Sequence, residues 1–265
     1  VFDYNIDKKK HRKHDINTFC FQLYIKFQEA IYMAQTYDLT RGKTSSVILK
    51  FFFPMFFTNM LQQLYTVADT AIVGKGLGDN ALASVGNMSS LTFLIIGFSL
   101  GISNGFSVSI AQSYGAGNHE KLKKAIATSV KLSVIVTIIL TAISMLFLKP
   151  VLVMLRTDES ILKDSLIYGY IIFGGLFSTI AYNMASCILR ALGDSKTPFT
   201  AIIVSTIINI GLNCFFIFGM KTGVEGVAIA TIIAQVVSAL ICFARLKKIE
   251  MIRLSSQDFK ADFAM

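Results

Sequence analysis

The chain has 265 residues, of which 54% are hydrophobic and only 15% are charged, and it contains 22 phenylalanines and no tryptophan. A soluble domain of this size would carry more surface charge, so the composition indicates a protein embedded in a lipid bilayer. In a soluble protein the net charge of +9 would suggest nucleic-acid binding, but most lysines and arginines lie in the breaks between apolar stretches. Membrane topology explains that charge, and we expect no nucleic acid as a partner.

Cysteine and histidine provide no metal or catalytic centre in the apolar segments. The 4 cysteines contain no CxxC pair, and His11, His14 and His119 all lie outside the apolar runs. The sequence also offers no nucleophile with a converging base. We therefore expect a protein that is not an enzyme, with no catalytic residue, no cofactor and no metal beyond a possible Na⁺.

The chain begins with a tail over residues 1–40 that does not share the apolar pattern. A basic run occupies residues 8–13, and the aromatic stretch at 19–32 is too short and too polar to span a membrane. One interpretation is an interfacial helix held to anionic lipid. We favour the other, in which the first 32 residues are non-native or disordered sequence ahead of Met33.

Six apolar segments then reach the length of about 20 residues that a membrane-spanning helix needs. They are predicted at 48–73, 91–111, 126–148, 161–182, 199–218 and 226–244. Glycine and proline punctuate the short breaks between them, so successive helices should be antiparallel neighbours. The predicted fold class is an all-α membrane protein, a bundle of six transmembrane helices.

The basic residues of alternate loops orient this bundle. The richer positions are Lys121, Lys123 and Lys124; Arg190 and Lys196; and Arg245, Lys247 and Lys248. Because positive residues favour the cytoplasmic side, we expect both termini in the cytoplasm and residues 74–80 outside. The protein should be a multi-pass component of the inner (plasma) membrane.

Asp69 is the only acid well inside an apolar run. An aspartate at the bilayer centre costs roughly 2.5–3.5 kcal/mol on insertion scales, so such residues are usually retained for ion or proton handling. Asp69 lies about 7 Å from the outer end of its helix, where a carboxylate can also reach interfacial water. From its depth alone, Asp69 could equally be an ion-coupling residue or an acid that is tolerated because it lies near the membrane interface.

The first span carries a polar stripe that includes this acid. Asn59, Gln62, Thr66 and Asp69 follow helical spacing, with Thr70 beside them. Such a stripe faces other helices or a cavity rather than lipid. We therefore take Asn59, Gln62 and Thr66 as cavity-lining candidates.

Two later spans bring polar residues to the depth of Asp69. The fifth carries Asn209 and Asn213 one turn apart, and the sixth carries Thr231 and Gln235. Asp69, Asn209, Asn213 and Thr231 would form a cation-binding site, because hard oxygens at one level suit Na⁺ or a proton resident on the acid. Gln235 is a further cavity-lining candidate. Ordinary interhelical hydrogen bonding explains Thr231 when it is considered alone.

Two other features concern helix shape. Pro54 would either bend the first span or mark its start. Gly97, Gly101 and Gly105 form a row on the second span that is typical of close helix packing.

From residue 41 onward the chain resembles the multidrug and toxic compound extrusion (MATE) family of secondary transporters. The matching stretches are Pro54 followed by QQLYTVADTAIVG at 62–74, AQSYGAG at 111–117, RALGDSKTP at 190–198, and NIGLN and FIFG within 209–219. The resemblance implies that residues 41–248 form one six-helix lobe of a two-lobed transporter. Residues 249–265 are then a cytoplasmic tail or the start of an inter-lobe linker, and the C-terminal six-helix lobe is a missing partner.

The resemblance also implies a function. Family members export drugs and organic cations, or other amphipathic compounds, in exchange for H⁺ or Na⁺. Asp69 matches the first-helix acid of the family's N-lobe ion site, and Asn209, Asn213 and Thr231 match its polar partners. Many members carry aspartate where this chain has Asn213, which leaves H⁺ and Na⁺ both open.

Three alternatives stay open beside this interpretation. A flippase of lipid-linked saccharides would line its cavity with basic residues that these spans almost lack, and a non-transporting scaffold would have no use for Asp69. A half-transporter that pairs with a second lobe competes with a fragment of a longer transporter, and we favour the fragment.

Overall fold

The computed structural model describes residues 44–249 and 252, and within them it forms helices and no strands. The elements are α2 (Thr44–Leu77), α3 (Asp79–Gly115), α4 (His119–Met154), α5 (Glu159–Gly174), α6 (Leu176–Ala191), α7 (Lys196–Cys214), the π-helix η1 (Phe215–Gly219) and α8 (Val224–Lys247). The predicted tail over residues 1–40 lies outside the described residues, as does nearly all of the segment 249–265. The all-α prediction is confirmed for the rest.

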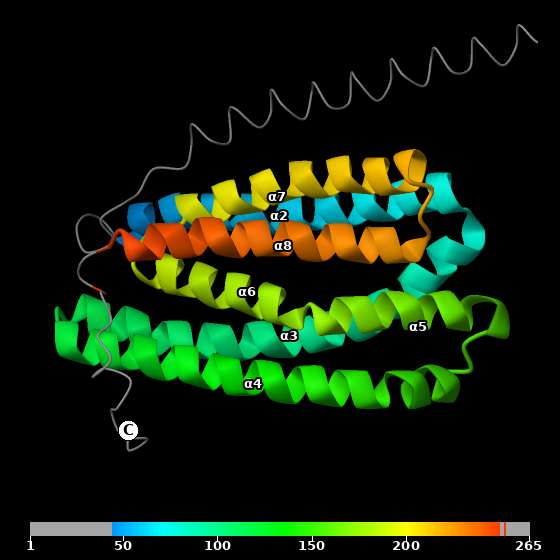
Figure 1. The fold of residues 1–265 in the computed structure, drawn as a ribbon. Helices are drawn as coiled ribbons and strands as arrows, with labels where there is room; N and C mark the ends of the chain where they lie inside the picture. The colour runs from blue at the N-terminus through cyan, green and yellow to red at the C-terminus, as the bar shows by residue number, and fades with distance from the viewer. Residues whose placement is uncertain (1–43, 250–251, 253–265) are drawn as a thin grey trace, which may run out of the picture.

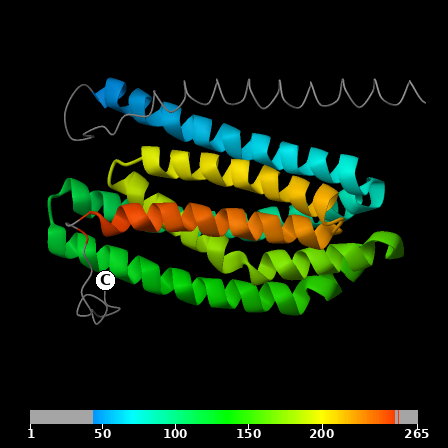
Figure 2. The ribbon, with the colours of Figure 1, turned by 45° about the horizontal axis from the view of Figure 1, so that its top comes forward.

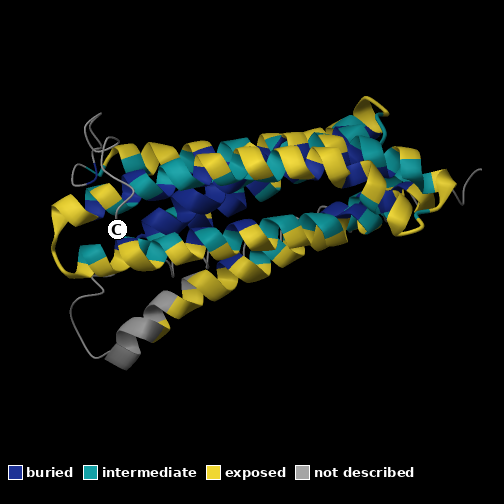
Figure 3. Ribbon diagram, turned by 90° about the horizontal axis from the view of Figure 1, so that it is seen from below, coloured by how far each residue is buried: buried dark blue, intermediate teal, exposed yellow. Residues whose placement is uncertain are grey.

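The helices form an elongated antiparallel bundle (Figure 1). Helix α8 packs between α7 and α6, α2 packs on α7, and α3 packs against α4, α5 and α6. Buried residues gather between these helices, while the outer faces of α2, α3 and α4 carry exposed apolar side chains (Figure 3). Large exposed residues such as Phe93 and Leu146 are expected where lipid rather than water is the solvent.

Four of the described helical segments are long and apolar enough to cross a bilayer. They are α3, α4, α7 with η1, and α8. The predicted fourth span corresponds to the pair α5 and α6, which meet at an angle of 45° and make a fifth span when the pair is counted as one. Helix α2 has 34 residues but is not among the helices that are apolar enough to cross a bilayer, because its polar stripe lowers its mean hydropathy.

The helices are longer than the apolar runs that predicted them. Helix α3 begins at Asp79 rather than at residue 91, and α6 continues to Ala191, past the predicted end at 182. Polar residues near the helix ends lower hydropathy without breaking the backbone, as where the Ser84 hydroxyl donates to the Asn80 carbonyl at 2.9 Å. Hydropathy therefore locates the middle of each helix better than its ends.

At the bend between α5 and α6 the backbone lies close to α8. A Cβ on Gly175 would lie 2.5 Å from Cδ1 and Cγ1 of Ile232, so only glycine fits there without displacement. The Gly175 carbonyl accepts hydrogen bonds from the Ser178 backbone N–H at 3.0 Å and from the Ser178 hydroxyl at 2.7 Å, so the first turn of α6 closes directly after the bend.

The structure changes the interpretation of the proline and of the glycine row. Helix α2 begins at Thr44, so Pro54 lies inside the helix and does not mark its start. A Cβ on Gly97, Gly101 or Gly105 would meet no atom within 4 Å. The expectation of close packing at this row is therefore wrong for the described helices, and the row faces open space.

The loops separate into two groups by charge. Figures 1 and 2 show the start of α2, the α3–α4 and α6–α7 connections and the end of α8 at one end of the bundle. That end carries the basic residues Lys121, Lys123, Lys124, Arg190, Lys196, Arg245, Lys247 and Lys248. We call it the basic end. Its assignment to the cytoplasm stays a prediction.

A labelling experiment tests that orientation. In a background without the four native cysteines, a cysteine replacing exposed Ala116 at the basic end should resist impermeant thiol reagents in intact cells. A cysteine replacing exposed Asp79 at the other end should react. The reverse labelling pattern would overturn the topology, and labelling of both positions after cell lysis is the control for access.

The bend predicts a specific cost for one methyl group. Gly175→Ala should lower the midpoint of thermal unfolding, because overpacking against Ile232 costs about 1–3 kcal/mol. Gly86→Ala is the matched control on α3, where the added Cβ meets no atom within 4 Å and alanine favours the helix by roughly 0.5–1 kcal/mol. Equal midpoints for the two variants in detergent would contradict this role for Gly175.

Candidate functional site

Asp69 lies in α2 with 8% of its surface exposed, and Asn213 on α7 is completely buried. The Asn213 Nδ2 donates a hydrogen bond to Asp69 Oδ1. No basic side chain among the described residues pairs with Asp69; the ion pair recorded in that part of the chain joins Arg245 to Asp194. A buried carboxylate is thus held by an amide and has no positive counter-charge.

The hydrogen bonds continue from Asp69 across three helices. Asn213 Nδ2 also donates to Asn209 Oδ1 at 3.0 Å, and Asn209 Nδ2 donates to Thr231 Oγ1 on α8 at 3.4 Å. Tyr65 Oη on α2 donates to the same Thr231 oxygen at 3.5 Å. The structure thus brings all four predicted cation-site residues into one network.

One atom of this network has no partner. Asn213 Oδ1 is buried and accepts no hydrogen bond. An unpaired buried acceptor costs about 1–3 kcal/mol, so such atoms in native proteins usually serve a ligand or another function. Beside the Asp69 carboxylate, this oxygen is a spare ligand for a proton donor or a cation. No cluster of three or more His, Cys, Asp or Glu occurs in the described part of the chain, so neutral oxygens must complete any ion shell here.

Local features of α2 and α7 hold the two side chains together. The chain turns into the π-helix η1 just after Asn213, and π-helical turns are frequent at functional sites. A Cβ on Gly76 would lie 2.5 Å from Cγ2 of Ile217 in η1. The missing side chain at Gly76 lets α2 approach the end of α7 closely enough for Asp69 to reach Asn213.

Sequence reasoning missed two tyrosines at this site. Tyr65 lies one turn before Asp69, so the helical spacing of the polar stripe could have identified it. Tyr168 on α5 is buried in the same hydrophobic cluster as Val73, which lies one turn after Asp69 on α2. It lies among apolar neighbours in a predicted span, and the sequence carries no signal for it.

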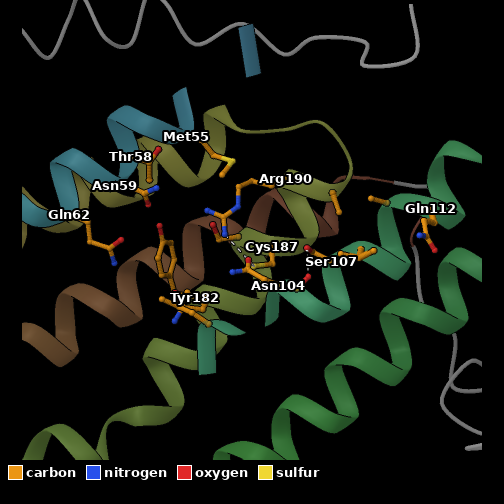
Figure 4. Close-up of a pocket in the computed structure, with 16 residues that line it drawn as sticks. Met55, Thr58, Asn59, Gln62, Asn104, Ser107, Gln112, Tyr182, Cys187 and Arg190 are labelled. Carbon is orange, nitrogen blue, oxygen red and sulfur yellow. Dashed lines mark hydrogen bonds between the residues drawn. The ribbon is translucent and has the colours of Figure 1, made fainter. Parts of the chain in front are cut away.

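A separate cavity of about 680 Å³ opens between α2, α3 and α6, nearer the basic end (Figure 4). It is lined by Met55, Thr58, Asn59, Gln62, Leu100, Asn104, Ser107, Val108, Ala111, Gln112, Tyr182, Asn183, Ser186, Cys187, Arg190 and Ala191. The cavity-lining candidates Asn59 and Gln62 are among these residues. Thr66 is not, and its hydroxyl donates to the Gln62 carbonyl of its own helix at 3.1 Å. Gln235 is not a lining residue either, and its Oε1 is buried without a partner.

The motif RALGDSKTP forms the α6–α7 connection at the basic end. Asp194 accepts hydrogen bonds from the Thr197 backbone at 3.0 Å, the Thr197 hydroxyl at 2.8 Å and Arg245 Nε at 2.9 Å. Partial burial opposes ionisation of Asp194, but the hydrogen bonds from Thr197 and Arg245 outweigh it and hold the pKa of that carboxyl below its usual value. This part of the motif is structural, since it ties the start of α7 to the end of α8.

Known proteins share this arrangement. The family model MatE matches residues 54–215. The probable multidrug resistance protein YoeA of Bacillus subtilis (strain 168) is 36% identical over 202 residues, which cover 75% of this chain and 44% of that protein. A protein of Shewanella oneidensis named FAD transporter is 25% identical over 213 residues, covering 78% of this chain and 46% of its own.

Solved structures agree with the sequence relatives. A crystal structure of MATE in the bent conformation superposes with a TM-score of 0.79 at 26% identity, covering 88% of this chain and 51% of the other. The chain thus spans about half the length of the proteins it matches. With a family model that matches more than half of its residues and with the same arrangement of helices, the chain belongs to the MATE family of membrane transporters.

Proposed function

We propose that this chain is the N-terminal lobe of a secondary active antiporter that exports amphipathic or cationic compounds in exchange for H⁺ or Na⁺. The observation that carries the proposal is the buried carboxylate of Asp69, which is bonded to Asn213 and has no counter-charge among the described residues. A buried charge of this kind attracts a cation from one side of the membrane and can release it on the other. The relatives are named for different compounds, one as a multidrug resistance protein and one as an FAD transporter. Membership of the MATE family alone therefore does not identify the compound that is transported.

The amide of Asn213 suggests how ion binding reaches the neighbouring helices. In the arrangement described, Nδ2 faces both Asp69 and Asn209, and Oδ1 has no partner. A proton on Asp69 would turn the carboxyl into a donor, and Na⁺ would need oxygen ligands; both favour Oδ1 over Nδ2 beside Asp69. Turning the amide breaks the bond from Nδ2 to Asn209 and so loosens the link to Thr231 on α8. Ion binding would in this way change the packing of α2, α7 and α8.

Removal of the titrating group tests the ion site. Asp69→Asn keeps the shape and most of the hydrogen bonding but cannot take up a proton or neutralise Na⁺. The natively expressed protein and the variant are reconstituted into liposomes at matched amounts. The rate of gradient-driven export should fall at least about tenfold in the variant, since a loss of about 1.4 kcal/mol of coupling free energy already has that effect. Asp79→Asn, which changes an exposed acid at the end of α3, is the control and should export like the parent.

The neutral partners should matter less. Asn209→Ala and Asn213→Ala each remove one polar ligand but keep the charge, so export should weaken and not disappear. If Asp69→Asn transports like the parent, Asp69 is a tolerated interface residue and the proposed ion site is wrong.

A second lobe is part of the proposal, because alternating access moves two repeats against each other around a site between them. Residues 1–265 expressed alone should therefore give no drug export in liposomes, whereas co-expression with a matching C-terminal lobe should restore it. Robust efflux by the purified chain without a partner would contradict the two-lobe requirement and indicate a half-transporter that pairs with itself.

A further inference from the structure

The cavity between α2, α3 and α6 has an unexpected charge for a transporter of organic cations. Its lining residues include no aspartate and no glutamate, and the only charged side chain among them is Arg190. In Figure 4 the Arg190 side chain extends from α6 toward Cys187 and Asn104 within the cavity. A cationic ligand would meet a like charge here and no counter-charge.

Arg190 has no acidic partner in the described part of the chain. Its recorded hydrogen bond runs from Nη2 to Cys187 Sγ at 3.2 Å, and the thiol in turn donates to Asn104 Oδ1 at 3.4 Å. Sulfur is a weak acceptor. The acid closest in sequence, Asp194, is bonded to Arg245 and Thr197. Apart from the bond to Cys187, the planar donors of Arg190 are therefore available to an oxyanion that enters the cavity.

A second, independent donor lines the same wall. Asn183 has only 4% of its surface exposed, and its Nδ2 is buried without a hydrogen-bond partner. Asn183, Ser186 and Arg190 follow helical spacing on α6, so they share the face that lines the cavity. Two N–H donor groups thus lie along about 10 Å of helix. In the described part of the chain the Asn183 Nδ2 has no acceptor, and Arg190 has the weak acceptor Cys187 Sγ.

We propose that this cavity binds an anionic group, a phosphate or a carboxylate, attached to an apolar body. Arg190 supplies the counter-charge, because its planar donors match both oxyanions, and Asn183 supplies a neutral donor deeper in the cavity. Met55, Leu100 and Val108 line the same space and take the apolar body. The inference rests on the proposed function and narrows its cargo to amphipathic molecules that carry a negative group, zwitterions included.

Two probes with oppositely charged head groups test the proposal. Their affinities are measured by titration calorimetry on the natively expressed protein, purified in a neutral detergent. The probes are 2-naphthyl phosphate and 2-naphthylmethylammonium, which share the aromatic body. The phosphate should bind more tightly, and Arg190→Gln should weaken it about tenfold or more while leaving the ammonium compound unchanged or slightly tighter. Asn183→Leu should also weaken the phosphate.

Two further variants separate a local effect from misfolding and from surface charge. Arg190→Lys keeps the positive charge and should retain most of the phosphate affinity. Lys124→Gln removes one exposed charge at the same end of the bundle and should leave the affinity unchanged. The proposal is overturned if the ammonium probe binds as tightly as the phosphate, or if Arg190→Gln and Lys124→Gln have equal effects.

The anionic group has two possible sources, a small molecule and a lipid headgroup, and nanodiscs distinguish them. If adding phosphatidylglycerol to phosphatidylcholine discs weakens naphthyl phosphate binding in the parent but not in Arg190→Gln, the lipid headgroup occupies the same site. If it has no effect, the ligand is a free amphipathic molecule. In an Asp69→Asn background, Arg190→Gln should still weaken naphthyl phosphate binding about tenfold or more relative to Asp69→Asn alone, so a failure of the ion site and a failure of the anion site give different results.

Discussion

The rest of this structure depends on one constraint, a carboxylate buried in a membrane bundle with no positive partner among the residues that the structure describes. Asp69 is tolerated because Asn213 donates to it and because Asn209, Thr231 and Tyr65 extend the hydrogen bonding across α2, α7 and α8. The glycine at position 76 and the π-helical turn η1 serve the same contact, since they bring α2 against the end of α7. A glycine inside a helix and a π-helical turn both weaken regular helix structure, and here both lie at the contact between α2 and the end of α7.

Helix α2 connects the two polar regions of the lobe. Its stripe contributes Asn59 and Gln62 to the cavity near the basic end, and Tyr65 and Asp69 to the ion site beyond it. The two regions have opposite charge: the ion site holds an unpaired acid, and the cavity holds an unpaired arginine. In the function that we propose, one helix would therefore carry ligands of the inward cation and one wall of the space for the exported compound. This arrangement provides a physical route for coupling, because a movement of α2 that follows ion binding must also reshape the cavity.

The residues of the candidate ion site could be brought together from the sequence, and the shape of the bundle could be predicted only in part. Asp69, Asn213 and Thr231 could be placed at one depth in the membrane from the sequence alone. The rise per residue and the up-down order of the spans fix how deep each residue lies in its helix. They could not identify Tyr168, whose helix neighbours are apolar, nor the bend at Gly175, which depends on Ile232 from another helix. The glycine row on α3 was misinterpreted for the same reason: small residues permit close packing, but only the fold decides whether a partner is there. The face of α6 for which we propose anion binding needed the structure too, since only the structure shows which partners surround Arg190.

Infrared difference spectroscopy of the reconstituted protein tests the central claim most directly, because it reports the protonation of individual carboxyl groups during a titration with acid or Na⁺. We predict a carboxylic-acid band that responds to pH or to Na⁺ in the parent and is missing from Asp69→Asn, with a simultaneous change in the side-chain amide bands that Asn213→Ala removes. Identical difference spectra for the parent and Asp69→Asn would show that Asp69 neither takes up a proton nor senses Na⁺, and would contradict the account.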